Sequence, residues 1–237
     1  MAVEQALQEF RETESGEAFS LQNHKLLKVE LAAVTIQAKL GSMVAYQGDV
    51  KFERAGSGGM SRLMKKMATG EGVKLMTVSG TGEVFLADHA QEVHLVKLDN
   101  DKITVNSSNL LAFDSGIDWD IRKVEGASGV LAGGLFNLEL SGSGWVALLS
   151  DGPPMLLQLK GDPAFADPQA AITWSSAVKT SVKTDMNLKT LIGRGSGETL
   201  QMEFAGDGWL LVQPSEGRVD VGSTASRGGG LGNLLGG

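Results

Sequence analysis

The chain has 237 residues, and its 28 acidic and 21 basic side chains give a formal net charge of −7 and a pI near 5.0. Binding along a nucleic acid requires clustered Lys and Arg, so this balance argues against an extended nucleic-acid surface. The absence of cysteine excludes disulfides, thiolate metal sites and thiol nucleophiles. A cysteine-free chain suits a reducing compartment, and we therefore expect a cytoplasmic protein.

The first 19 residues form a polar, acidic N-terminal extension with a weak helical pattern. They contain neither the basic nor the apolar region of a signal peptide. No apolar run in the chain approaches the ~20 residues that a membrane-spanning helix requires. We therefore expect a soluble protein with a frayed N-terminus.

A Gly-x-Gly pattern flanked by apolar strand residues recurs three times. The glycines are Gly80 and Gly82, Gly142 and Gly144, and Gly206 and Gly208. An apolar triplet precedes each pair, at residues 44–46, 111–113 and 172–174. Two features repeated in the same order indicate a tandem repeat. They predict one β-body over residues 20–220, composed of units 20–98, 99–160 and 161–220.

Short runs with strand periodicity follow one another through these units. Residues 73–78 and 83–87 flank the first glycine pair, which we interpret as a hairpin turn because tight turns need positive φ. Further strands are expected at residues 93–98 and 155–159. Many short strands with frequent turn signals predict an all-β fold. We expect three antiparallel modules, each like a β-sandwich or a double-stranded β-helix, in a pseudo-threefold arrangement.

One segment in the first unit has helical spacing instead. Its apolar positions are Met60, Leu63, Met64 and Met67, and its basic residues Arg62, Lys65 and Lys66 lie off that face. Flexible methionine side chains beside positive charges suit a contact with a protein partner or a membrane surface. The alternative is that this short helix caps the β-body with its methionines inward. The glycine-rich tail at 221–237 is expected to stay flexible.

The histidines and carboxylates are candidates for a metal site or a catalytic centre. Asp88, His89, Glu92 and His94 are four possible ligands within seven residues. However, a turn at His89 and the alternation of side chains along a strand separate them, so we expect a polar turn and an exposed strand histidine, with no metal or cofactor. No Gly-x-Ser-x-Gly motif joins a strand to a helix, and no catalytic residues are predicted.

Three stretches carry a resemblance to a known family: residues 41–53, the glycine-rich insertion leading to residues 69–71, and residues 194–204. With the Gly-x-Gly pairs, they resemble the altered-inheritance-of-mitochondria, protein twenty-four family over nearly the whole chain apart from both tails. At fold level, that family is similar to the tryptophan RNA-binding attenuation protein, with three such modules in tandem. The family's mitochondrial members are associated with inner-membrane organisation, and its role in bacteria is poorly defined.

These observations favour a non-enzymatic scaffold or protein-interaction module, with a membrane or membrane protein as a candidate partner of residues 60–67. The alternative is a protein that binds a small ligand or nucleic acid. Because the edges of β-sheets must be covered or paired, we also expect a homo-oligomer.

Overall fold

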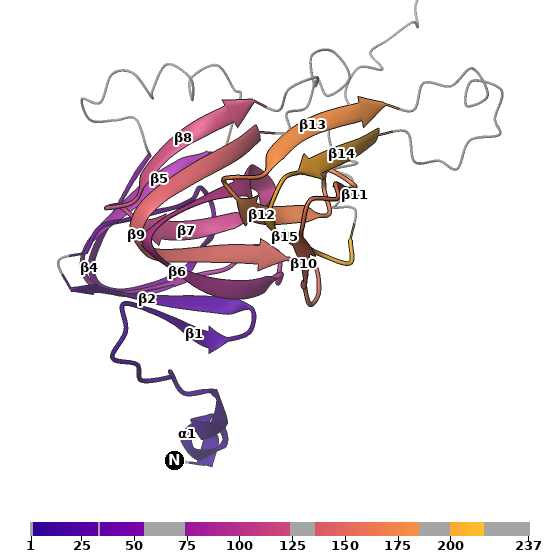
Figure 1. Cartoon of the computed structure of the whole chain (residues 1–237). Helices are drawn as coiled ribbons and strands as arrows, with labels where there is room; N and C mark the ends of the chain where they lie inside the picture. Colours follow the sequence, from indigo (N-terminus) through magenta and orange to yellow (C-terminus); the bar gives the residue numbers. More distant parts are fainter. Residues whose placement is uncertain (1, 33, 55–73, 124–135, 185–199, 216–237) are drawn as a thin grey trace, which may run out of the picture.

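The computed structural model of the chain describes residues 2–32, 34–54, 74–123, 136–184 and 200–215 (Figure 1). The prediction of an all-β fold is confirmed. The strands are β1 (Phe19–Asn23), β2 (Leu26–Ala32), β3 (Ile36–Lys39), β4 (Met43–Arg54), β5 (Leu75–Leu86), β6 (Glu92–Asn106), β7 (Leu110–Asp114), β8 (Asp118–Lys123), β9 (Phe136–Ser150), β10 (Met155–Leu159), β11 (Ala164–Ala166), β12 (Ala171–Ser175), β13 (Lys179–Thr184), β14 (Leu200–Ala205) and β15 (Gly208–Val212). The helices α1 (Ala2–Ala6), η1 (Gln8–Phe10) and η2 (Ser107–Asn109) are short. Within the described ranges, no helix has the length and apolar character needed to cross a membrane.

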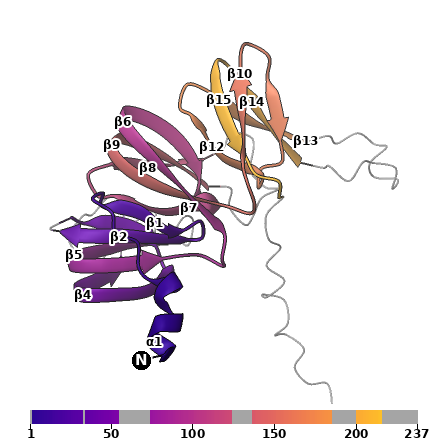
Figure 2. The ribbon, with the colours of Figure 1, turned by 90° about the horizontal axis from the view of Figure 1, so that it is seen from below.

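The strands form one large antiparallel sheet and one small sheet. The large sheet has the order β1-β2-β5-β3-β7-β9-β6-β12-β15-β10, with β4 paired to β5 and β8 paired to β9. The small sheet has the order β11-β14-β13. β4 lies at one end of the molecule, and β10, β14 and β15 lie at the other, in both views (Figures 1 and 2).

The Gly-x-Gly pairs mark bends in strands, and our prediction of hairpin turns at these glycines is wrong. Gly80 and Gly82 lie inside β5, which pairs with β4 over residues 76–86, and Gly142 and Gly144 lie inside β9. The third pair, Gly206 and Gly208, flanks the short break between β14 and β15. All six glycines have positive φ, between 111° and 152°. The chain therefore passes through each glycine pair without reversing.

Close approach of a neighbouring strand is the physical reason for these glycines. A Cβ on Gly82 would overlap the carbonyl oxygen of Gln47 in β4, and one on Gly208 would overlap the hydroxyl of Ser175. A Cβ on Gly144 would lie 2.7 Å from Oδ2 of Asp114. The side chains of Asp114 and Ser175 also form hydrogen bonds with the backbone at the bends. Asp114 Oδ2 accepts from the N–H of Trp145 at 2.6 Å, and Ser175 Oγ accepts from the N–H of Trp209 at 3.2 Å.

Each bend allows the two halves of one strand to pair with different neighbours. In β5, residues 81–86 pair with β2 and residues 75–78 pair with β3. In β9, residues 146–148 pair with β7 and residues 136–141 pair with β8. In the third case, β15 pairs with β12 and β14 pairs with β13.

The buried apolar side chains gather in three clusters along the chain. The first is centred on Leu27, Val29 and Val84, the second on Phe113, Leu140 and Val146, and the third on Trp174, Phe204 and Leu210. Trp174 and Phe204 meet edge to face, with ring centroids 5.2 Å apart. Each cluster lies beside one of the three bends, so the bent strands enclose the apolar interior.

Replacing Gly82 with alanine tests the role of the bend. Gly82→Ala combines a disfavoured φ of 140° with a backbone overlap, and we expect a loss of about 2–4 kcal/mol in the free energy of unfolding. Urea denaturation would measure it. Gly41→Ala is the matched control, because Gly41 also has positive φ but open space at its Cβ position. Equal losses in the two variants would contradict the close-approach explanation.

Candidate interaction surface

The segment predicted to contact a partner lies outside the described residues. It comprises Met60, Arg62, Leu63, Met64, Lys65, Lys66 and Met67, in the connection between β4 and β5. The glycine-rich tail at 221–237 also lies outside the described ranges. The contact through residues 60–67 therefore stays a prediction.

The structure separates the histidines considered as metal ligands. His89 Nδ1 lies 2.6 Å from Asp88 Oδ1, while the other carboxylate oxygen of Asp88 forms an ion pair with Lys39. His94 instead contacts Ser150 on the neighbouring strand. Over the described part of the chain, no three His, Asp or Glu side chains converge in a way that could hold a metal ion.

His94 is half-buried in β6 rather than exposed as we had predicted. Its Nε2 lies 2.7 Å from Ser150 Oγ, and the Ser150 hydroxyl donates to the carbonyl oxygen of Gly152 at 2.7 Å. Because the Ser150 hydroxyl proton is used in that bond, Ser150 Oγ accepts a hydrogen bond from the Nε2–H of His94. Burial lowers the pKa of His94 and outweighs the opposing effect of the Glu92 carboxylate. This arrangement suits a neutral structural histidine.

A buried lysine, which sequence reasoning missed, joins the N-terminal extension to the large sheet. The side chain of Lys28 in β2 is only 3% exposed, and its Nζ lies 2.7 Å from Glu83 Oε1 and 3.4 Å from Glu12 Oε2. Nζ also donates to the carbonyl oxygen of Thr13 at 3.2 Å. The lysine within the apolar run of residues 26–29 was the available signal. A buried ammonium group requires such partners.

The charges of this cluster stabilise one another. The hydrogen bond from Lys28 holds the pKa of Glu83 below its usual value despite partial burial. Burial acts to lower the pKa of Lys28, but its hydrogen bonds and ion pairs with Glu83 and Glu12 raise it overall. Both groups are therefore ionised at neutral pH. Their partners are all supplied within the chain, which indicates a structural role.

A second buried polar network joins the end of β15 to the body, and no local feature of the sequence indicates it. Asn109 Nδ2 donates to the Leu149 carbonyl at 2.9 Å and to Gln213 Oε1 at 3.3 Å. Gln213 Oε1 also accepts from the N–H of Asp151, and its Nε2 donates to the Gln169 carbonyl. Because these amides bond within the chain, we interpret the network as structural.

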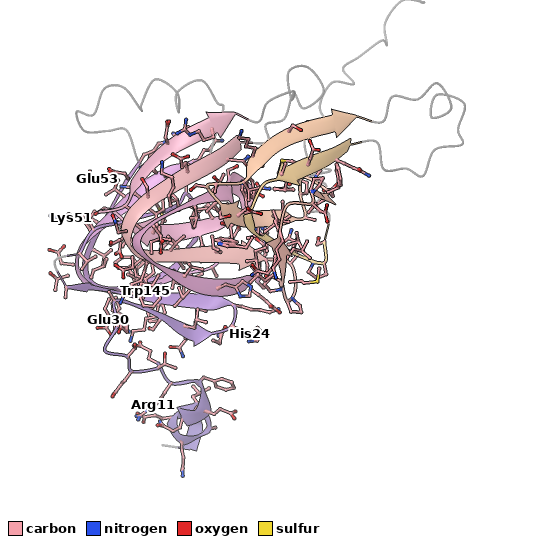
Figure 3. All side chains as sticks on the ribbon, in the orientation of Figure 1. Arg11, His24, Glu30, Lys51, Glu53 and Trp145 are labelled. Atoms are coloured by element: carbon pink, nitrogen blue, oxygen red, sulfur yellow. The ribbon has the colours of Figure 1, made fainter. Side chains whose placement is uncertain are left out.

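β4 presents an exposed edge. Among the described strands it pairs with β5 alone, and most of its residues are exposed. Its first half contains the exposed apolar residues Met43, Val44 and Tyr46. Its second half contains Lys51 and Glu53, which lie at the outer margin of the molecule (Figure 3). The apolar and charged halves meet at Gly48, opposite Gly82.

Two further exposed edges, one on each sheet, lie at the other end of the molecule. In the described part of the chain, β10 pairs with β15 alone and β11 pairs with β14 alone. Met155 and Leu156 of β10 and Phe165 of β11 are exposed. An unpaired edge offers a row of backbone N–H and C=O groups to another strand, and exposed apolar side chains favour such pairing. The edges of β4, β10 and β11 are therefore the candidate interaction surfaces.

Removing the carboxylate of Glu83 tests the Lys28 cluster. At pH 7 we expect Glu83→Gln to lower the free energy of unfolding by about 1–3 kcal/mol, because the buried Lys28 loses one charged partner while Glu83 itself is partly exposed. The folded-state pKa of Glu83 is lowered, so its contribution is present above the unfolded value of about 4.3 and is lost as pH falls through the folded value. Urea denaturation from pH 7 to pH 3 should show the two proteins converging in acid.

Glu30→Gln is the control for this variant. Glu30 stands opposite Glu83 across β2 and β5, and like charges in that position are unfavourable. The control should therefore keep or slightly gain stability. A Glu83→Gln variant as stable as wild type at pH 7 would contradict the assigned role.

The pKa of His94 can be tested by NMR titration. We expect it to titrate below the ordinary value of about 6.5, because burial favours its neutral form. Stability that depends on neutral His94 is present above that value and is lost as pH falls through the folded-state pKa. His94→Gln should therefore reduce the fall in stability between pH 7 and pH 5. Titration of His94 above 6.5 would refute this assignment.

Comparisons with known proteins agree with this all-β architecture. The family model described as Mitochondrial biogenesis AIM24 matches residues 19–215. Among solved structures, the chain is similar to the crystal structure of protein SPYM3_0169 from Streptococcus pyogenes, with a TM-score of 0.66 and 20% sequence identity over 82% of this chain and 91% of that one. At this identity, the likeness shows the fold alone. A search of the curated proteins finds no match. The family match covers most of the chain, which therefore belongs to the Mitochondrial biogenesis AIM24 family.

Proposed function

We propose that this protein is a non-enzymatic scaffold that binds polypeptide chains along its exposed strand edges. The observation that carries the proposal is the first half of β4, where Met43, Val44 and Tyr46 are exposed on a strand with a free edge among the described strands. Soluble proteins usually protect such an edge with charge, proline or a covering segment. Exposed apolar residues at an unpaired edge instead favour strand addition, in which backbone hydrogen bonds provide affinity and side chains provide specificity.

The scaffold, in this proposal, consists of three tandem modules and works in the cytoplasm. The recurrence of the bend supports the modules, because a close approach by a neighbouring strand and the same three-strand pairing occur at Gly82, Gly144 and Gly208. The cysteine-free composition supports a reducing compartment. Neither the described residues nor the comparisons add support for a membrane contact, a small ligand or a nucleic acid, and we do not extend the proposal to them.

Photo-crosslinking in cells tests whether a polypeptide binds at the exposed edge of β4. With p-benzoylphenylalanine in place of Tyr46, we expect illumination to attach the protein covalently to a polypeptide, visible as a band of higher mass on a denaturing gel. The same residue in place of Asp99, an exposed position on β6, is the control and should give little product. Mass spectrometry of the product then identifies the attached chain. Equal, weak labelling at both positions would overturn the proposal.

A further inference from the structure

The further inference rests on the proposed function and concerns the polypeptide that covers β4. The described part of the chain contains two junctions, in each of which a strand of one unit pairs with a strand of the next unit and covers its edge. In the first, β3 pairs with β7 and places Gln37 opposite Phe113. In the second, β6 pairs with β12 and places Thr104 opposite Trp174. Both junctions are antiparallel and contain three residue pairs.

The aromatic residues of these junctions, Phe113 and Trp174, have an equivalent in the first unit, which is Tyr46. Phe113 pairs with Val146 and Trp174 pairs with Leu210. Each partner lies two residues after the second glycine of its bend, Gly144 or Gly208. Tyr46 pairs with Val84, which lies two residues after Gly82. Tyr46 therefore occupies the position that Phe113 and Trp174 occupy in the two internal junctions.

The strands that cover those aromatic residues also have a third counterpart. The first residues of the two covering segments are Ile36, which pairs with Val78, and Ile103, which pairs with Leu140. Val78 and Leu140 each lie four residues before the second glycine of a bend. Phe204 lies four residues before Gly208, and it pairs with Ala164. β11 therefore corresponds to the covering strands, with Phe165 in the position of Gln37 and Thr104.

The exposure of these residues indicates that, within the described part of a single chain, one junction is incomplete. Phe113 is 0% exposed and Trp174 is 1% exposed, whereas Tyr46 is 49% exposed. Phe165 of β11, the expected covering strand, is 52% exposed. β4 and the sheet that contains β11 lie at opposite ends of the molecule (Figures 1 and 2), so β11 does not cover β4 of the same chain.

We propose that β11 of one copy of this chain pairs with the first half of β4 of the next copy. The internal junctions fix the register: Ala164 lies opposite Gln47, Phe165 opposite Tyr46, and Ala166 opposite Ala45. Phe165 and Tyr46 then form a cross-strand aromatic pair, a favourable combination on one face of a sheet. Because the two edges are different surfaces, the contact is heterologous and repeats from copy to copy until a ring closes or a filament grows.

Disulfide trapping between copies tests both the partner and the register, since the natural chain has no cysteine. Purified Ala45→Cys and Ala166→Cys proteins are mixed and oxidised gently. In the proposed register these residues are directly opposite, within the Cα separation of about 4.4–6.8 Å that a disulfide spans. We expect at least a fivefold excess of the mixed dimer over that formed by Ala45→Cys with Ala164→Cys, where the diagonal separation is about 7–8 Å.

A charge exchange supplies a second, independent readout. In light scattering after size exclusion, we expect wild type to form oligomers and Phe165→Glu to be monomeric. Adding Tyr46→Lys to Phe165→Glu should restore assembly, because opposite charges then face each other between copies. Matching circular dichroism spectra and unfolding transitions would show that the single variant remains folded.

The possible results separate this inference from the proposed function. A monomeric wild type, or equal trapping by residues 164 and 166, would overturn the pairing of β4 with β11. If photo-crosslinking at Tyr46 then captures a different protein, the scaffold proposal stands and only the self-assembly inference fails. If Tyr46 captures no polypeptide, both fail. Capture of this same chain, together with selective trapping at residue 166, would support both.

Discussion

The close approach of a neighbouring strand, which leaves no room for a Cβ, is the constraint on which this fold depends. At Gly82 the carbonyl oxygen of Gln47 occupies the place of a side chain, and at Gly144 and Gly208 the side chains of Asp114 and Ser175 do so. Positive φ at the same glycines bends the strand while its pairing continues. One strand thereby pairs with different neighbours on the two sides of the bend, and the bent strands enclose three apolar clusters.

Buried polar groups secure the ends of this framework. Lys28 connects the N-terminal extension to the large sheet through Glu12 and Glu83, and Gln213 connects the end of β15 to η2 and β9 through Asn109. In both cases the partners come from distant parts of the sequence, and burial makes each lost hydrogen bond costly. Both networks are satisfied by groups of the same chain. In the described part of the chain, the exposed apolar side chains of β4, β10 and β11 lie instead on strands with a free edge.

The sequence allowed the all-β class to be predicted and located the three bends, but it did not show their geometry. A glycine pair between apolar runs has the same local pattern whether the chain reverses or bends, and only the distant contact of Gly82 with Gln47 distinguishes the two. Lys28 shows the same limit, because its burial depends on Glu83, a partner 55 positions away (83 − 28). The expectation that edges need covering followed from general sheet physics. Identifying which edge required the pairing register.

The two halves of β4 differ in how readily they can pair with another strand. Beyond Gly48, Lys51 and Glu53 place charge on the edge, which discourages unplanned pairing. Before Gly48, the exposed residues 43–46 include no charged side chain.

β11 has only three residues, and Pro163 and Pro168 stand close to its two ends. Proline supplies no N–H to a strand ladder, which limits how far such pairing can extend. A contact of three residue pairs is the length that both internal junctions use. In the proposed contact, the short uncharged half of β4 and the short strand β11 match in length, which favours one specific contact over general edge-to-edge aggregation.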